Sequence, residues 1–342
     1  MGKMAIILTM GMTVLIAFFV LRLNSNAKEG LSTTVNMYEN TQARLIANSG
    51  IEIYLEKMRR DKTLSGTFLN QKGIDGSYDL YISGPDTNLT IRSIGYYLDV
   101  QHETIVQARR DPVKFPAPPA PLYVSTSAMA NVQMTGNFTV SGWNHDKDGN
   151  IISKIQSGGA TPGVAVDNPA DSAAIVDILK KNTANNITGV DGTTPDVRVK
   201  NLGIDWADIS LDLAFSADQT LGSGKYNTGK FGDYANPQIT MINGSADFTG
   251  NISGAGILII NGDVTIEGTF NFQGLVIAYK KSTITTKLNG NGSVIGSFIV
   301  SGDAVDMDIS NGTFSALYSS QALDNAKANL KSSRFQILSW WE

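Results

Sequence analysis

The chain opens with an uninterrupted apolar run, Met4 to Leu21, bracketed by Lys3 and Arg22. At about 1.5 Å per residue, a helix over this run is roughly 27 Å long, close to the thickness of the hydrocarbon core of a bilayer. A cleaved secretory signal has a shorter apolar centre and then small residues at a cleavage site, whereas helical periodicity resumes here. The pattern predicts a retained membrane-spanning helix over residues 1–22, with lipid contact through residues 4–21.

An amphipathic pattern follows over residues 23–62 and predicts a stalk helix. Its apolar residues recur at helical spacing: Leu31, Val35, Tyr38, Leu45, Ile51, Tyr54, Leu55 and Met58. No proline interrupts the chain from Met4 to Arg60, so we expect one continuous helix about 85 Å long. A rod of this length cannot bury its own apolar stripe. We expect its outer half to pack on a globular domain and its inner half to contact lipid or neighbouring copies.

Short alternating strands are predicted next, in a small β-rich connector over residues 63–121. The segments SerTyrAspLeuTyrIleSer at 77–83 and AsnLeuThrIleArgSerIle at 88–94 alternate and flank a GlyProAspThr turn, and residues 97–109 supply a third strand. We expect these strands to cover one end of the β structure that follows. A stiff proline-rich linker, Pro116 to Pro121, closes the connector.

An internal repeat occupies residues 238–320. Residues 239–256 and 257–274 repeat at a spacing of 18, and two slightly longer units follow, 275–296 and about 297–316. The recurring turn residues are Asn243 with Asn261, Gly244 with Gly262, and Gly250 with Gly268. Short apolar strands separated by such turns predict a β-solenoid, in which each coil stacks on the one before. A β-sandwich with turn glycines that recur by chance is the alternative.

An earlier segment, 122–142, shows the same pattern. Its apolar positions align Val132 with Val264, Met134 with Ile266, Phe138 with Phe270 and Val140 with Phe272. We therefore predict about five coils, with residues 122–142 separated from the others by an insertion lobe at 143–237. Two inward ladders are predicted, one of Ile239, Ile257 and Leu275 and the other of Phe248, Ile266 and Ile284.

The carboxy-terminal residues 321–342 are predicted to form a cap. A short helix at 321–332 would cover the far end of the stack, because open ends of a solenoid invite pairing with other chains. The final segment ArgPheGlnIleLeuSerTrpTrpGlu is predicted as a strand laid on the stack. The expected fold class is therefore α+β, a long transmembrane and amphipathic helix carrying a mostly β passenger with a short β-solenoid.

Composition narrows the classes of function. The net charge of −4 argues against a nucleic-acid partner, because no basic surface large enough to neutralise several phosphates is apparent. The chain has no cysteine, which excludes disulfides, thiol catalysis and cysteine-ligated metals.

One segment has the spacing of a cation site. Oxygen-bearing side chains at alternate positions with Gly149 in the sixth place match the first half of a calcium loop: Asn144, Asp146, Asp148 and Asn150. The twelfth position is Ile155 rather than a bidentate glutamate, so a solvated Asx-rich turn is the alternative. These four residues are the candidate calcium ligands, and we expect no required cofactor.

Catalysis has little support in the sequence. The chain lacks the GxSxG, HExxH and phosphate-loop motifs, and both histidines, His102 and His145, are expected at the surface. The enzymatic alternative is a glycan-active β-helix with paired carboxylates from Asp303, Asp306 and Asp308. The last two alternate with apolar residues, however, which favours an outward, solvated strand face. We therefore expect no enzyme.

Two parts of the chain resemble type IV pilin-like proteins with a PilX-type N-terminal domain. AlaArgLeuIleAlaAsnSerGlyIleGluIleTyrLeu at 43–55 is similar to the first helix of that family. The segment 122–142 with the following TrpAsnHisAspLysAspGlyAsn, and ProGlyValAlaVal at 162–166, resemble the passenger. The resemblance implies an inner-membrane precursor with its bulk outside the cytoplasm. It also implies processing by a prepilin peptidase, partner pilin-like subunits and assembly machinery, and a place in, or initiation of, a surface filament.

Two departures from that family bear on the role. The only leader-like glycine is Gly2, an unusually short leader, and the glutamate that major pilins place fifth in the mature chain would fall at Ile7. No acidic residue occurs before Lys28, so the sequence favours a minor or initiating subunit. A stand-alone membrane-anchored surface adhesin remains the main alternative.

Overall fold

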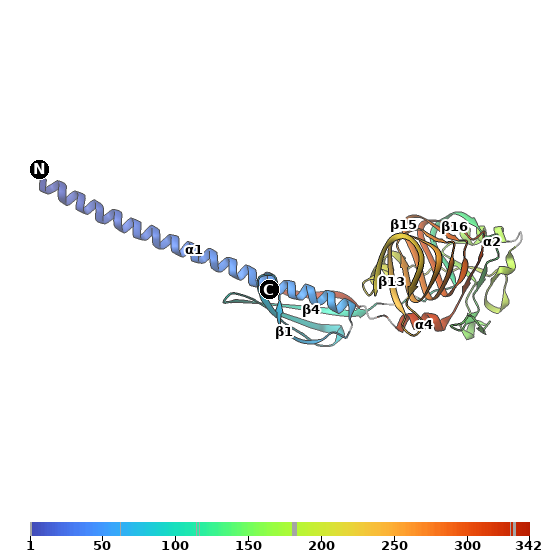
Figure 1. Ribbon diagram of the computed structural model, residues 1–342. Helices are drawn as coiled ribbons and strands as arrows, with labels where there is room; N and C mark the ends of the chain where they lie inside the picture. The colour runs from blue at the N-terminus through green and yellow to red at the C-terminus, as the bar shows by residue number, and fades with distance from the viewer. Residues whose placement is uncertain are drawn as a thin grey trace. The chain divides into compact units, whose positions relative to one another are not determined.

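The computed structural model describes residues 2–61, 63–113, 115, 117–179, 183–328, 330 and 333–342. They form two compact units, one of Met1–Asp111 with Ser333–Glu342 and the other of Pro112–Ser332. The first unit holds a long helix and a small sheet, and the second holds a β-solenoid with short helices (Figure 1). A long apolar helix followed by a mostly β passenger confirms the predicted α+β class.

Helix α1 runs without a break from Gly2 to Arg60 and spans 59 residues, or about 88 Å. Lys57, Arg59 and Arg60 lie in its last turn, where cations interact favourably with the helix dipole. Arg60 also pairs with Glu56 one turn earlier, at 3.1 Å. The predicted continuous helix is therefore confirmed.

A five-stranded sheet completes the first unit, in the order β1-β2-β3-β4-β18. Its strands are β1 Gly66–Lys72, β2 Ser77–Ser83, β3 Leu89–Tyr97, β4 Val100–Pro112 and β18 Ser333–Trp341, and the 3₁₀ turn η1 Asp86–Asn88 lies between β2 and β3. The strands predicted at 77–109 are present and pack on α1. That they also cover one end of the solenoid stays a prediction. The predicted placement of the carboxy-terminal strand on the stack is wrong, because β18 joins the edge of this sheet beside β4.

The outer half of α1 lies flat on this sheet. Ile51, Tyr54 and Met58 are at most 2% exposed and form one core with the apolar residues of β2, β3 and β4. Burying side chains of this size stabilises by about 1.5–3 kcal/mol each. The helix approaches so closely that a Cβ atom on Gly95 of β3 would lie 2.2 Å from the carbonyl oxygen of Ala43. The predicted packing of the outer stripe on a globular domain is confirmed.

Parallel strands build the solenoid of the second unit. They are β12 Gln219–Phe231, β13 Gln238–Ile260, β14 Val264–Ile266, β15 Thr269–Leu288, β16 Asn291–Asp308 and β17 Thr313–Leu317. Residues one repeat apart pair in register, so Gly256 faces Gly274 and Gly274 faces Gly296. All three glycines have φ between +119° and +138°, a backbone conformation that other residues rarely adopt. This glycine ladder turns the chain at one corner of successive coils.

The predicted early coil also belongs to the stack. Strand β5 Leu122–Gln133 pairs with β16, and β6 Thr139–Ser141 pairs with β17, although about 175 residues separate them in sequence. The pairing from coil to coil runs Val264 to Thr286, then Met307, then Val132. The residue alignment predicted for residues 122–142 is therefore confirmed, and sequence distance concealed a direct contact.

One predicted ladder faces the opposite way. The interior core contains Leu258, Val276 and Phe298, whereas Ile257 and Leu275 point outward and are buried under two helices. Those helices are α3 Trp206–Ala214 and α4 Ser320–Ala328, with Trp206, Leu213, Leu323 and Ala326 in the contact. Both faces of these strands are thus buried, which explains why their sequences are continuously apolar and do not alternate. In the second ladder Phe248 and Ile266 do face inward, and the third member is Leu288 instead of Ile284.

The region predicted as an insertion lobe contributes to the solenoid. It contains β7 Asn144–His145, β8 Ile151–Ser153, η2 Gln156–Gly158, β9 Val164–Val166, α2 Pro169–Leu179, η3 Ala184–Asn186, β10 Ile187–Thr188, η4 Val190–Gly192 and β11 Val197–Val199, and then α3 and β12. Strands β9 and β10 extend the stack beyond β5 and β6, and β12 forms the layer at its other end. The boundary expected at residue 237 is therefore wrong, because β12 already belongs to the solenoid. The sequence does not reveal this, since β12 is polar and lacks the repeat signature.

The ends of the stack are covered differently from the prediction. Ile175 and Leu179 of α2 are buried in the interior core and close the end beyond β5 and β6. Helix α4, predicted to cover the far end, lies instead along the side of β13, β15 and β16. Three residues of the predicted cap, Asn329, Lys331 and Ser332, and one residue of the proline-rich linker, Pro116, lie outside the described residues.

Candidate functional site

The inner half of α1 exposes a continuous apolar surface. Its most apolar 18-residue window has a mean hydropathy of 1.9 and none of it is buried within the chain. The helix is therefore long and apolar enough to cross a bilayer, which fits a membrane anchor. Beyond the window, Leu31, Val35 and Tyr38 are 67%, 43% and 56% exposed. Burial begins only at Ala43, so the helix changes from an exposed to a packed element within one continuous segment.

The four candidate calcium ligands do not all converge. Asp146 and Asn150 come together, because the Asp146 carboxylate accepts hydrogen bonds from the Asp148 and Asn150 backbone N–H groups and from the Asn150 amide. Asn144 is buried and its side-chain oxygen accepts from Ser320 N at 3.1 Å. The Asp148 carboxylate pairs with Lys147 at 2.7 Å.

The geometry of this loop is that of an Asx turn closed by Asp146. The amide of Asn150, with help from its backbone N–H, holds the pKa of the Asp146 carboxyl below its usual range. Among the described residues, no group of three or more His, Asp or Glu side chains has the arrangement of a metal site. A calcium ion would have to compete with three donors that already occupy the Asp146 carboxylate.

Two of the three candidate carboxylates of the enzymatic alternative accept hydrogen bonds from different neighbouring side chains and do not form a pair. Asp306 accepts a hydrogen bond from Asn131 at 3.3 Å, and Asp308 accepts from Asn289 and Ser310. Val305 and Met307 point into the solenoid core, so these two acids face outward as predicted. Asp303 alone of the three lines a groove.

The two histidines differ from each other in burial. His145 is only 3% exposed, and its Nδ1 lies 3.0 Å from the carbonyl oxygen of Tyr318, to which it donates. His102 in β4 is half-buried, and its Nε2 is buried without a hydrogen-bond partner among the described residues. The expected surface position is therefore wrong for His145, which has a structural role beside the start of α4.

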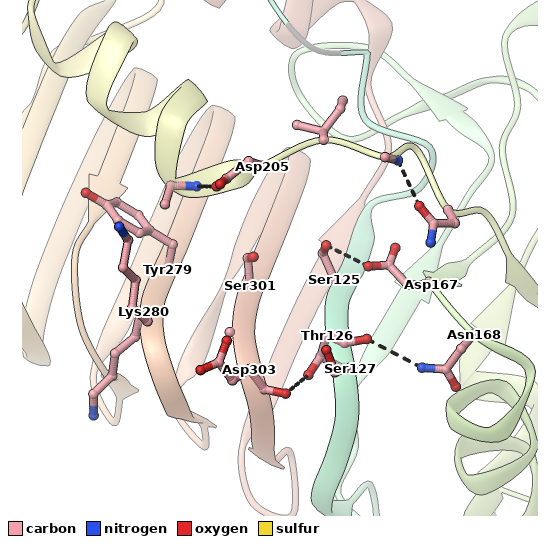
Figure 2. A pocket seen from close by; sticks show the side chains of 16 residues that line it. Ser125, Thr126, Ser127, Asp167, Asn168, Asp205, Tyr279, Lys280, Ser301 and Asp303 are labelled. Carbon is pink, nitrogen blue, oxygen red and sulfur yellow. Dashed lines mark hydrogen bonds between the residues drawn. The ribbon is translucent and has the colours of Figure 1, made fainter.

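A polar groove of about 970 Å³ lies along the side of the solenoid (Figure 2). Its floor comes from three adjacent strands: Ser125, Thr126 and Ser127 of β5, Ser301, Gly302 and Asp303 of β16, and Tyr279, Lys280 and Lys281 of β15. The segment 201–207 before and within α3 forms one wall, and Asp167 and Asn168 close one end. Of the groove's lining, sequence reasoning had singled out Asp303 alone, because the other residues are ordinary polar positions spread over most of the second unit.

One end of the groove has a fixed hydrogen-bond arrangement. The Asp167 carboxylate accepts from the Tyr123 hydroxyl and, at 2.8 Å, from Ser125. Burial and this hydrogen bond raise the pKa of Tyr123 to about 12. Tyr123 also packs edge-on against Trp206 of α3, with ring centroids 5.7 Å apart. The end wall is therefore tied to the core beneath it.

Comparisons with known proteins match this chain to a few solved structures. No protein-family model matches the chain, and no curated protein sequence is significantly similar to it. The crystal structure of competence-associated pilin ComZ from Thermus thermophilus aligns with 89% of this chain and 97% of its own, at 11% identity and a TM-score of 0.23. A superposition at that TM-score carries no argument about fold or function.

Proposed function

We propose that this protein is a non-enzymatic, membrane-anchored, pilin-like subunit that is incorporated in, or initiates, a type IV pilus-like filament. The observation that carries the proposal is the division of α1. One continuous helix has an apolar inner segment that is not buried within the described part of the chain, and an outer half whose apolar face is packed against a small sheet. The sequence resemblance at residues 43–55 falls within that packed half.

The physical reason is the free energy of exposed apolar surface. Water-exposed aliphatic surface costs about 25 cal/mol per Å², so the inner half of α1 must be covered by lipid or by protein. A bilayer covers the span from residue 4 to 21. It does not reach the stripe of Leu31, Val35 and Tyr38, which suits the neighbouring helices of a filament. The protein would be anchored in the inner membrane with its bulk outside the cytoplasm, and would reach the cell surface on assembly.

The absence of an acidic residue before Lys28 supports a minor or initiating role. A carboxylate buried among packed apolar helices requires a partner, and here no such group is present to pair with a neighbour's amino terminus. Copies of this chain therefore lack that means of fixing their own register. We propose that other pilin-like subunits are its partners and that a prepilin peptidase and the assembly machinery process it.

Fractionation of the native host tests the proposal. Filaments sheared from cells are separated from membranes, and the protein is detected in each fraction and sequenced from its amino terminus. We expect it in the sheared filaments, with a mature chain that begins at or near Lys3. Protein found only in membranes with Met1 intact would contradict filament incorporation and favour the stand-alone adhesin.

A further inference from the structure

The polar groove on the solenoid is built across coils, not along a strand. Tyr279 pairs with Ser301 and Ser301 with Ser125, and Asp167 follows the strand that pairs with β5. Neighbouring strands are about 4.8 Å apart, so this row of four residues is about 14 Å long. The groove is open along its length, which suits a segment of a linear polymer.

Three polar side chains in the walls of the groove already have hydrogen-bond partners within the chain. Asp205 accepts from the backbone N–H groups of Ala207 and Asp208, and Asn201 accepts from Gly203 N at 2.8 Å. Asp167 is held by its two hydroxyl donors, as Figure 2 shows for Ser125. Such internal hydrogen bonds fix the shape of the walls before any ligand arrives.

The floor, in contrast, presents free polar groups. The side chains of Ser127, Ser301, Lys281 and Asp303 make no hydrogen bond or ion pair with any residue that the structure describes. Lys280 differs, because its ammonium group lies 2.8 Å from the Asp263 carboxylate. The free set comprises two hydroxyls, one ammonium donor and one carboxylate acceptor, all of which line the same groove.

This set of groups selects one chemical class. The lining acids and lysines nearly balance, so the groove lacks the excess of cations that a phosphate backbone requires. The aromatic residue among its described lining, Tyr279, is 4% exposed and offers no stacking surface to a base. The lining is too polar to anchor an apolar peptide side chain. Hydroxyl, ammonium and carboxylate groups side by side instead complement a ligand that carries many hydroxyls.

We propose that this groove binds an uncharged glycan chain, with Lys281 donating to and Asp303 accepting from its hydroxyl groups. Ile204 in the wall supplies an apolar contact for the C–H face of a sugar ring. The function is binding without cleavage, because most glycoside hydrolases use a pair of carboxylic acids. Among the described lining residues, Asp303 is the only acid whose carboxylate is not already engaged. The inference rests on the groove and is independent of filament assembly.

The test uses the full-length chain in detergent micelles. Its binding to immobilised neutral chito-, cello- and malto-oligosaccharides and to polygalacturonate is compared with that of the double variants Lys281→Met/Asp303→Asn and Lys287→Met/Asp306→Asn. The second pair is the matched control, since it removes the same charges from the same two strands, β15 and β16, outside the groove.

We expect binding to at least one neutral glycan, little binding to polygalacturonate, and a loss of at least tenfold in the first variant only, as for one charge-assisted hydrogen bond. A third variant, Ser301→Tyr, fills the floor and should abolish binding while the thermal unfolding curve keeps its midpoint. The absence of binding to every neutral glycan would overturn the proposal. An equal loss in both double variants would do so as well, because it would place the site elsewhere.

Discussion

The docking of α1 on its sheet can be tested by adding a single methyl group. In Gly95→Ala, the new Cβ atom would lie 2.2 Å from the Ala43 carbonyl oxygen and 2.6 Å from Ala47 N, both backbone atoms of α1. Ordinary van der Waals contact begins at 3.4 Å, so the helix must move about 1.2 Å away from the sheet at this point. Overpacking of this kind costs about 1–3 kcal/mol. We therefore expect the outer half of α1 to open about 5- to 150-fold more often.

Hydrogen exchange of peptides from residues 43–58 measures that opening directly, and peptides from 239–317 serve as the internal reference. The matched control is Ser93→Ala on the same strand. Ser93 is fully buried and its hydroxyl has no partner among the described residues, so its removal relieves an unsatisfied group without adding volume. We expect exchange in Ser93→Ala to equal or fall below that of the wild type. Wild-type exchange in Gly95→Ala, or equal acceleration in both variants, would refute close helix–sheet packing.

Three further predictions concern the second unit. Gly274→Ala should prevent the solenoid from folding, because φ at Gly274 is +129° and the new Cβ would lie 2.1 Å from the Gly256 oxygen. Gly222 has open space around it, so the control Gly222→Ala should retain the wild-type melting curve measured by circular dichroism. Burial and a hydrogen bond to a carboxylate raise the pKa of Tyr123 to about 12, so its stabilising contribution is complete below about pH 10 and is lost as the pH rises to 12. The urea midpoint of unfolding should fall over that range, and a Tyr123→Phe variant should show a shallower fall. Identical pH profiles of the two proteins would contradict this role. The pKa of Asp146 is lower in the folded than in the unfolded chain, so its carboxylate stabilises the fold above the unfolded pKa, and this contribution is lost as the pH falls through the folded pKa. Asp146→Ala should therefore remove part of the destabilisation by acid. Neither calcium nor a chelator should shift the wild-type melting temperature, and a rise with calcium would instead support the calcium site.

Local signals in the sequence were sufficient for much of this fold. The helix from Gly2 to Arg60 followed from an apolar run and a stripe without proline, both of which depend only on near neighbours. The coil at 122–142 could be aligned because alternation and turn glycines recur at the same offsets in every layer. The alignment held even though the paired segments lie far apart in the chain.

The remaining features depend on tertiary partners that a local pattern does not encode. Ile257 and Leu258 are equally apolar, and only the presence of α3 and α4 outside the coil decides which of them faces inward. Strand β18 alternates like many strands, but nothing in its residues identifies β4 as its neighbour. The groove as a whole was not predicted for the same reason. Asp303 was singled out, but it and Lys281 come to line one groove only when β15 and β16 pair.

The most direct test of the central claim places a photo-crosslinker on the exposed stripe of α1. The chain has no cysteine, so Val35→Cys labelled with a benzophenone maleimide reports one position, and Thr33→Cys, roughly 200° around the helix, is the matched control. In sheared filaments from cells that express each variant, we predict a covalent adduct between the label of Val35→Cys and another pilin-like subunit, identified by mass spectrometry, and a weaker adduct from Thr33→Cys. Recovery of labelled protein only from membranes, with no subunit adduct from either variant, would contradict the pilin-like account.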